Sequence, residues 1–125
     1  MCFFVCCERR LMKTVDSVKL VQKERYSILE AAKALKSDLP VTRVILFGSK
    51  ARGSGEPDSD IDLLVLTHCP VTSKLRQAIS YQLADINLHN DVLLTSVVVS
   101  EQEWANGLIR HTLIHSEVER DGCET

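Results

Sequence analysis

Two aspartates separated by one residue, Asp60 and Asp62, stand at the start of an apolar run that ends at Leu66. Side chains alternate between the two faces of a β-strand, so both carboxylates would lie on one face, about 7 Å apart at ~3.3 Å per residue. Ionised carboxylates at this spacing repel each other, and a hard divalent cation such as Mg²⁺ would relieve that repulsion. Taken alone, an Asp-x-Asp pair is also common on the solvent face of an edge strand.

The segment before the pair has the composition of a phosphate-binding turn. Gly48 and Ser49 follow a short run of β-branched and apolar residues. Glycine leaves room for phosphate oxygens, and a helix beginning near Lys50 would aim its positive N-terminus at an anion. Lys50 and Arg52 add positive charge. A phosphate cradle and a carboxylate pair on neighbouring strands together predict a site for a metal-bound nucleoside triphosphate.

A third carboxylate would complete such a site, and Asp91 is the candidate. The run from Asn87 to Leu94 is predicted to form a third strand, extended or restarted through Val97 to Val99. If this strand lies beside the one that carries the aspartate pair, Asp91 can face the pair. A single Asp at a strand start is also common without any role. Asp85 is the rival candidate, but it falls in the helical part of the pattern.

The hydrophobic pattern supplies the elements that must position these groups. Apolar residues three or four apart predict helices, and apolar runs bounded by turn residues predict strands. The order helix, strand, strand, helix, strand, helix predicts an α/β (α+β) domain with a single small mixed β-sheet and helices packed against it. The predicted elements are a helix from Thr14 to Ser37 with a break near Lys23, strands Val41–Phe47 and Asp60–Leu66, a helix capped by Thr72 or Ser73, the strand described above, a helix from Ser100 to Glu119, and a frayed tail from Asp121 to Thr125.

The composition is that of one soluble globular domain. The chain has 125 residues, of which 45% are hydrophobic and 26% are charged. A formal net charge of -2 gives no indication of a long nucleic acid as partner. No stretch approaches the ~20 apolar residues of a membrane span. Together with the odd number of cysteines described next, this leads us to expect a cytoplasmic protein.

The N-terminal segment stands apart from this pattern. Residues 1–11 fit none of the predicted elements, and we expect them to be a disordered extension or a mis-assigned start, with Met12 as the better one. The five cysteines are odd in number, which favours reduced thiols over a disulfide framework. A zinc site built from Cys2, Cys6, Cys7 and a distant histidine is a less favoured alternative.

Two short motifs connect these features to a known family. Residues 48–53 are Gly-Ser-Lys-Ala-Arg-Gly, and residues 59–65 are Ser-Asp-Ile-Asp-Leu-Leu-Val. Together they resemble the signature of the DNA polymerase β-like nucleotidyltransferase superfamily, and the short chain resembles its minimal nucleotidyltransferase (MNT) group over residues 12–122. Residues 90–94, Asn-Asp-Val-Leu-Leu, resemble the group's third-carboxylate strand, although Asn90 stands where the family more often has an apolar residue.

The resemblance implies a fold, a reaction and a set of site residues. The fold would be that of the polymerase β-like nucleotidyltransferases. Asp60, Asp62 and Asp91 would be the catalytic carboxylates and would bind two Mg²⁺ ions spaced ~3.5–4 Å. Asp91 would also take the proton of the acceptor hydroxyl. The residues expected to bind the nucleotide are Gly48, Ser49, Lys50, Arg52, Gly53 and Ser59.

The resemblance also suggests a partner. MNT proteins resemble the antitoxins of HEPN–MNT toxin–antitoxin pairs, which would move AMP from ATP to a tyrosine of a HEPN toxin. Two alternatives remain open: a catalytically idle module that neutralises a partner by covering it, and a small-molecule nucleotidyltransferase. The last predicted helix carries apolar residues on more than one stripe, which favours core packing around Trp104 over a partner surface. A homo-oligomer is also compatible with the sequence.

Overall fold

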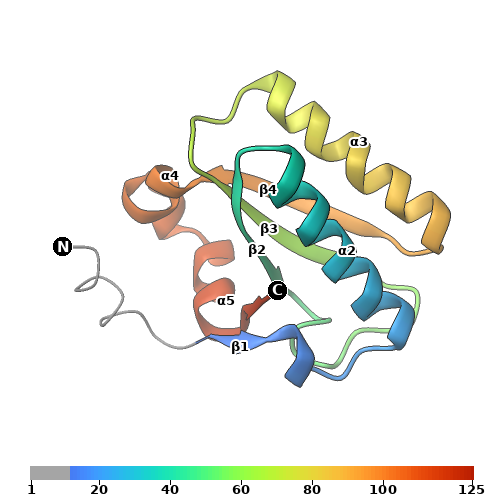
Figure 1. Cartoon of the computed structure of the whole chain (residues 1–125). Helices are drawn as coiled ribbons and strands as arrows, with labels where there is room; N and C mark the ends of the chain where they lie inside the picture. The colour runs from blue at the N-terminus through green and yellow to red at the C-terminus, as the bar shows by residue number, and fades with distance from the viewer. Residues whose placement is uncertain (1–11) are drawn as a thin grey trace.

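The fold is built on a five-stranded mixed sheet in the order β1-β5-β2-β3-β4 (Figure 1). The computed structural model describes residues 12–125, and the expectations for residues 1–11 and for their cysteines lie outside that range. At the centre, β2 (Val41–Phe47) pairs antiparallel with β3 (Ile61–Thr67). β4 (Leu94–Ser100) runs parallel to β3. The short strands β1 (Lys13–Thr14) and β5 (Cys123–Glu124) complete the sheet on the side of β2.

Helices cover both faces of the sheet (Figure 1). On one face lie α2 (Gln22–Asp38) and α3 (Ser73–Asn90), over a buried cluster that includes Ile61 and Leu63 of β3. On the other face lie α4 (Glu101–Asn106), the 3₁₀ turn η2 (Leu108–His111) and α5 (Leu113–Asp121). The cluster beneath these includes Leu64 and Leu66. The strands are apolar on both faces because both faces are covered.

The central strands and two helix caps are confirmed. The predicted strand Val41–Phe47 is observed with the same bounds, and β3 begins one residue after Asp60. Thr72 caps α3 by accepting a hydrogen bond from the Leu75 amide at 3.1 Å. Ser100 caps α4 in the same way. The expected α/β architecture with one mixed sheet is therefore correct. No helix within residues 12–125 has the length and hydropathy of a membrane span.

The first predicted helix begins too early. Residues that were expected to start it form β1 and the 3₁₀ turn η1 (Val15–Ser17), and α2 begins only at Gln22. The guanidinium of Arg25 explains the difference, because it donates hydrogen bonds to the carbonyls of Val15 and Val18. These side chain to backbone bonds hold the segment in a non-helical path while both valines stay buried.

Two C-terminal predictions are wrong. The helix expected from Ser100 to Glu119 is divided at Gly107, where a Cβ atom would lie 2.6 Å from the Glu103 carbonyl oxygen. The tail is not frayed, because residues 123–124 form β5 against β2. Arg43 of β2 forms an ion pair with Glu124, which anchors that strand. Trp104 does pack in the core as expected, stacked on His115 with ring centroids 4.4 Å apart.

Candidate active site

The Gly48-Ser49 turn follows β2 directly. The amides of Ala51 and Arg52 donate to the Gly48 carbonyl at 3.1 and 3.3 Å, which makes residues 48–53 a single helical turn in place of the predicted longer helix. Ala51 is the first residue whose backbone N–H bonds within the turn. The backbone N–H groups of Ser49 and Lys50 precede it, so they correspond to the unpaired leading amides of a helix. Leading amides of a helical turn can bind phosphate oxygens, which is the role that the sequence predicts for this turn.

Gly48 brings this turn into contact with one of the two aspartates. Its φ of 80° lies in the left-handed region, where a side chain is strained. A Cβ atom at Gly48 would lie only 2.5 Å from Asp62 Oδ2. The register of the sheet explains this approach, because Phe47 at the end of β2 pairs with Asp62. The glycine is therefore required both by the turn and by the carboxylate beside it.

Asp60 directly precedes β3 and Asp62 is its second residue, which lies against the Gly48 turn. Ile61 between them is buried under α2 and α3, so Asp62 points toward the face of α4 and α5. Asp60 is exposed, and Asp62 is partly buried. The hydroxyl of Thr95 on β4 donates to Asp62 Oδ1 at 3.0 Å. This bond fixes the carboxylate next to the phosphate-binding turn.

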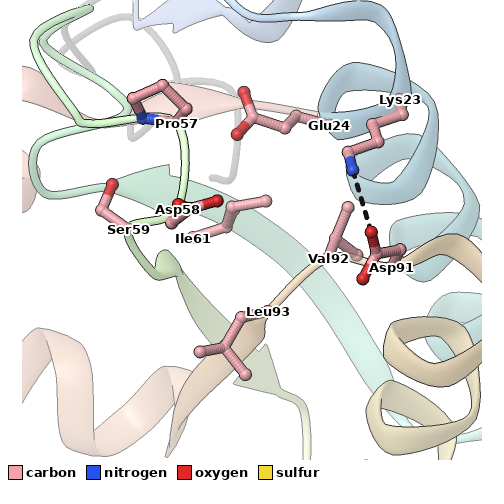
Figure 2. Close-up of a pocket in the computed structure, with 9 residues that line it drawn as sticks. All are labelled: Lys23, Glu24, Pro57, Asp58, Ser59, Ile61, Asp91, Val92 and Leu93. Atoms are coloured by element: carbon pink, nitrogen blue, oxygen red, sulfur yellow. Dashed lines mark hydrogen bonds and ion pairs between the residues drawn. The ribbon is translucent and has the colours of Figure 1, made fainter.

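Asp91 does not lie on a strand, and the prediction that it faces the aspartate pair is wrong. Residues 87–90 continue α3, and Asp91 caps this helix in the left-handed conformation with φ 55°. Its side chain is 99% exposed and pairs with Lys23 of α2 at 3.4 Å. Both Asp91 and Ser59 line a pocket of about 200 Å³. In Figure 2 the ion pair lies on one side of this pocket and Ser59 on the other. Ile61 also lines that pocket, so Asp91 lies on the opposite face of β3 from Asp62.

The physical reason for this error is a side-chain contact that local alternation does not reveal. The side-chain amide of Asn87 accepts a hydrogen bond from the backbone N–H of Leu94 at 2.8 Å and donates one to the Leu94 carbonyl at 3.1 Å. Asn87 thus joins the last turn of α3 to the first residue of β4. The residue of β4 that pairs with Asp62 is Thr95, four residues after the predicted carboxylate.

Lys50 does not contribute its charge to the turn. Its ammonium forms a buried ion pair with Glu24 of α2 at 2.6 Å and donates to the Glu56 carbonyl at 2.8 Å. The ammonium of Lys50 therefore has internal partners in this structure, and a nucleotide-binding role for Lys50 stays a prediction. The ion pair joins the N-terminal turn of α2 to the turn at residues 48–53, and the bond to Glu56 joins that turn to the loop that follows it. Glu24 was missed in the sequence because it lies 26 residues away.

The other expected nucleotide-binding residues lie around the same turn. Arg52 is exposed and reaches Asp121 of α5, with 3.7 Å between Nη1 and Oδ2. Gly53 ends the turn with φ 75°. The hydroxyl of Ser59 donates to the Glu56 carbonyl at 2.8 Å and so closes the loop before β3. Within the turn, Arg52 is the basic residue whose side chain is exposed, whereas Ser59 shapes the loop.

The donor set fits a magnesium ion that shares its ligands with substrate. Within residues 12–125 there is no group of three or more His, Cys, Asp or Glu side chains that could hold a metal alone. Mg²⁺ commonly binds through one or two carboxylates together with substrate phosphates. Asp62 lies beside the Gly48-Ser49 turn and Asp60 comes two residues before it, so this pair could supply hard oxygen ligands in this mode. The expected set of three carboxylates around two ions is not assembled.

Residues 28–116 match the sequence model of a known protein family, the nucleotidyltransferase domain. A relative from Methanocaldococcus jannaschii named "Putative protein adenylyltransferase MJ0141" is 35% identical over 77 residues, which cover 57% of this chain and 78% of the relative.

Solved structures share the fold. A chain of a toxin–antitoxin crystallised with AMP-PNP superposes with a TM-score of 0.54 at 18% identity, over 83% of this chain and 72% of that one. A chain from a tri-AMPylated Shewanella oneidensis HEPN toxin in complex with an MNT antitoxin gives a TM-score of 0.52 at 17% identity, over 81% of this chain and 70% of that one. At these identities the likeness concerns the fold.

Proposed function

Because the chain belongs to the nucleotidyltransferase domain family, we propose that it moves AMP from ATP onto a hydroxyl of a partner protein in a Mg²⁺-dependent reaction. One observation carries the proposal: the carboxylate of Asp62 lies against Gly48 at the head of the phosphate-binding turn. A triphosphate on the turn would then lie within reach of the aspartate pair. The relative named as a protein adenylyltransferase supports both the nucleotide and the class of acceptor.

Each part of the site has a distinct task in this reaction. The amides of Ser49 and Lys50 bind phosphate oxygens, and Arg52 adds an exposed positive charge beside them. Asp60 and Asp62 hold the divalent cation against the triphosphate. When bound, Mg²⁺ supplies the positive charge that offsets the triphosphate and the two carboxylates. Transfer joins the acceptor oxygen to the α-phosphorus and releases pyrophosphate and the hydroxyl proton.

The proposed acceptor is a tyrosine of a HEPN-type toxin, which makes the chain the antitoxin of the pair. Two observations on similar folds support this choice. One toxin–antitoxin holds the ATP analogue AMP-PNP, and one HEPN toxin in complex with an MNT antitoxin is tri-AMPylated. The tyrosine itself follows from the family resemblance in the sequence. An idle binding module would not need the contact between the turn and Asp62, so an enzyme is the better account.

The proposal is tested by incubating the chain with a HEPN-type toxin, Mg²⁺ and each of the four nucleoside triphosphates. We expect the toxin to gain mass in units of AMP, with ATP alone, and the modified peptide to contain a tyrosine. Chelation of the divalent cation should stop the reaction. Mass gain without a divalent cation, or on the chain itself in place of the toxin, would argue against this function.

A further inference from the structure

Thr95 occupies the position beside the aspartate pair at which the sequence suggested a third carboxylate. It is the residue of β4 that pairs with Asp62 in the parallel register of β3 and β4. It is partly buried, and Val97 and Val99 follow on the same face of the strand. A neutral hydroxyl therefore stands next to Asp62 where a charged ligand was expected.

The hydroxyl of Thr95 engages one specific oxygen of Asp62. It carries a single proton and lies 3.0 Å from Asp62 Oδ1 but 3.5 Å from the Ile61 carbonyl oxygen. The shorter distance and the negative charge of the acceptor both favour the bond to Asp62. Oδ1 is thereby held by the neighbouring strand, and the orientation of the whole carboxylate is determined.

The other oxygen of Asp62 is directed to the place where a substrate would bind. Oδ2 is the atom that a Cβ at Gly48 would approach to 2.5 Å. The carboxylate thus has one oxygen fixed by the sheet and one beside the phosphate-binding turn. The Thr95 hydroxyl opposes any rotation of the Asp62 side chain that would break its bond to Oδ1 and move the carboxylate away from the turn.

We propose that Thr95 is a positioning residue that orients Asp62 toward the cation and the triphosphate. The inference rests on the proposed nucleotidyl transfer and adds a residue to that same site. Partners that orient a metal ligand typically change metal affinity by about 10–100-fold when they are lost. Thr95 acts through Asp62 and needs no contact with the substrate.

The test compares Thr95→Val, which keeps the side-chain shape and removes the donor, with Thr95→Ser, which keeps the donor. The readout is the binding of Mn²⁺, measured by electron paramagnetic resonance in the presence of AMP-PNP. We expect Thr95→Val to weaken Mn²⁺ binding about tenfold. Thr95→Ser should remain close to the original chain. The Mg²⁺ concentration that gives half-maximal transfer should rise in parallel for the valine variant alone.

Controls separate orientation of the ligand from general damage. Thr42→Val removes a hydroxyl that bonds the Leu66 carbonyl and Glu101 at the far end of β2, and it should leave Mn²⁺ binding unchanged. Thr95→Ala removes the same donor without adding a methyl group, and it replaces the valine variant if that chain does not fold.

The outcomes separate the role of Thr95 from the proposed nucleotidyl transfer. If the original chain binds Mn²⁺ with AMP-PNP but the donor-less variants bind it equally well, the role of Thr95 is wrong and the proposed function stands. If the original chain binds no Mn²⁺ with AMP-PNP, the proposed function and the role of Thr95 both fail.

Discussion

The buried ion pair between Lys50 and Glu24 offers a sharp test of how the phosphate-binding turn is held. The two side chains are 6% and 7% exposed, and their charged atoms lie 2.6 Å apart. The Lys50→Met substitution keeps the apolar stem and removes the ammonium. It leaves the Glu24 carboxylate buried with only a long hydrogen bond, 3.4 Å from the Val21 amide, and it removes the donor to the Glu56 carbonyl.

The expected cost of this substitution is large. Removal of one partner of a buried ion pair costs about 3–5 kcal/mol, because an uncompensated charge remains inside the protein. Domains of this kind have a total free energy of unfolding of about 5–15 kcal/mol. For a urea m-value of ~2 kcal/mol/M, a loss of ~4 kcal/mol lowers the unfolding midpoint by about 2 M. Urea unfolding followed by circular dichroism measures this shift.

Two further variants test whether the loss of stability comes from an unpaired buried charge. The exposed ion pair between Lys23 and Asp91 is the matched control, and Lys23→Met should cost less than about 1 kcal/mol. The double substitution Glu24→Met with Lys50→Met should recover most of the lost stability, because no buried charge is left unpaired. An unchanged midpoint in Lys50→Met, together with a raised KM for ATP, would refute this reasoning. Lys50 would then be a phosphate ligand, as the sequence first suggested.

Three other predictions follow from the geometry. Gly48→Ala should reduce transfer at least about tenfold and cost about 1–3 kcal/mol of stability in urea unfolding, because the new Cβ strains the turn and displaces Asp62. Asp91→Asn should keep transfer within about threefold of the original rate in a steady-state assay, since its carboxylate pairs with Lys23 on the other face of β3. Burial raises the pKa of the Cys123 thiol, with Asp121 also raising it and Lys13 lowering it, so peptide mapping should find Cys123 unalkylated by iodoacetamide at neutral pH unless the chain is unfolded.

The sequence predicted those parts of the fold whose signals are local. Val41–Phe47 is an apolar run bounded by Pro40 and Gly48, and its bounds are confirmed. Ser100 was identified as a cap, and Thr72 was one of two candidates with Ser73, because a cap depends only on the next three residues. The turn after Phe47 and the start of β3 were predicted for the same reason. Their chemistry is contained in one short stretch of chain.

The remaining features depend on contacts between residues that are distant in sequence. The end of α3 is set by Asn87 bonding to Leu94, and α2 starts late because Arg25 bonds to carbonyls before it. The tail becomes a strand through the ion pair between Arg43 and Glu124. The spacing of apolar residues along the chain does not reveal these long-range contacts. The sequence therefore predicted correctly that Gly48 and Asp62 lie together, where the turn and the strand meet. It placed Asp91 wrongly, because that placement depends on the register of β4.

The central claim is that Asp60 and Asp62 hold the cation for nucleotidyl transfer, and one comparison tests it most directly. Label from α-labelled ATP is followed onto a HEPN-type toxin for the variants Asp62→Asn and Asp60→Asn and for the control Asp58→Asn. The exposed carboxylate of Asp58 lines the pocket of Figure 2, which Asp91 also lines. Each site variant loses a carboxylate that holds the cation, and the cation stabilises the charge of the transition state by several kcal/mol. The rate of transfer should therefore fall more than about 100-fold in both variants. The control should transfer label at close to the original rate, with all three chains equally stable. Transfer by Asp62→Asn at the rate of the control would contradict the assignment.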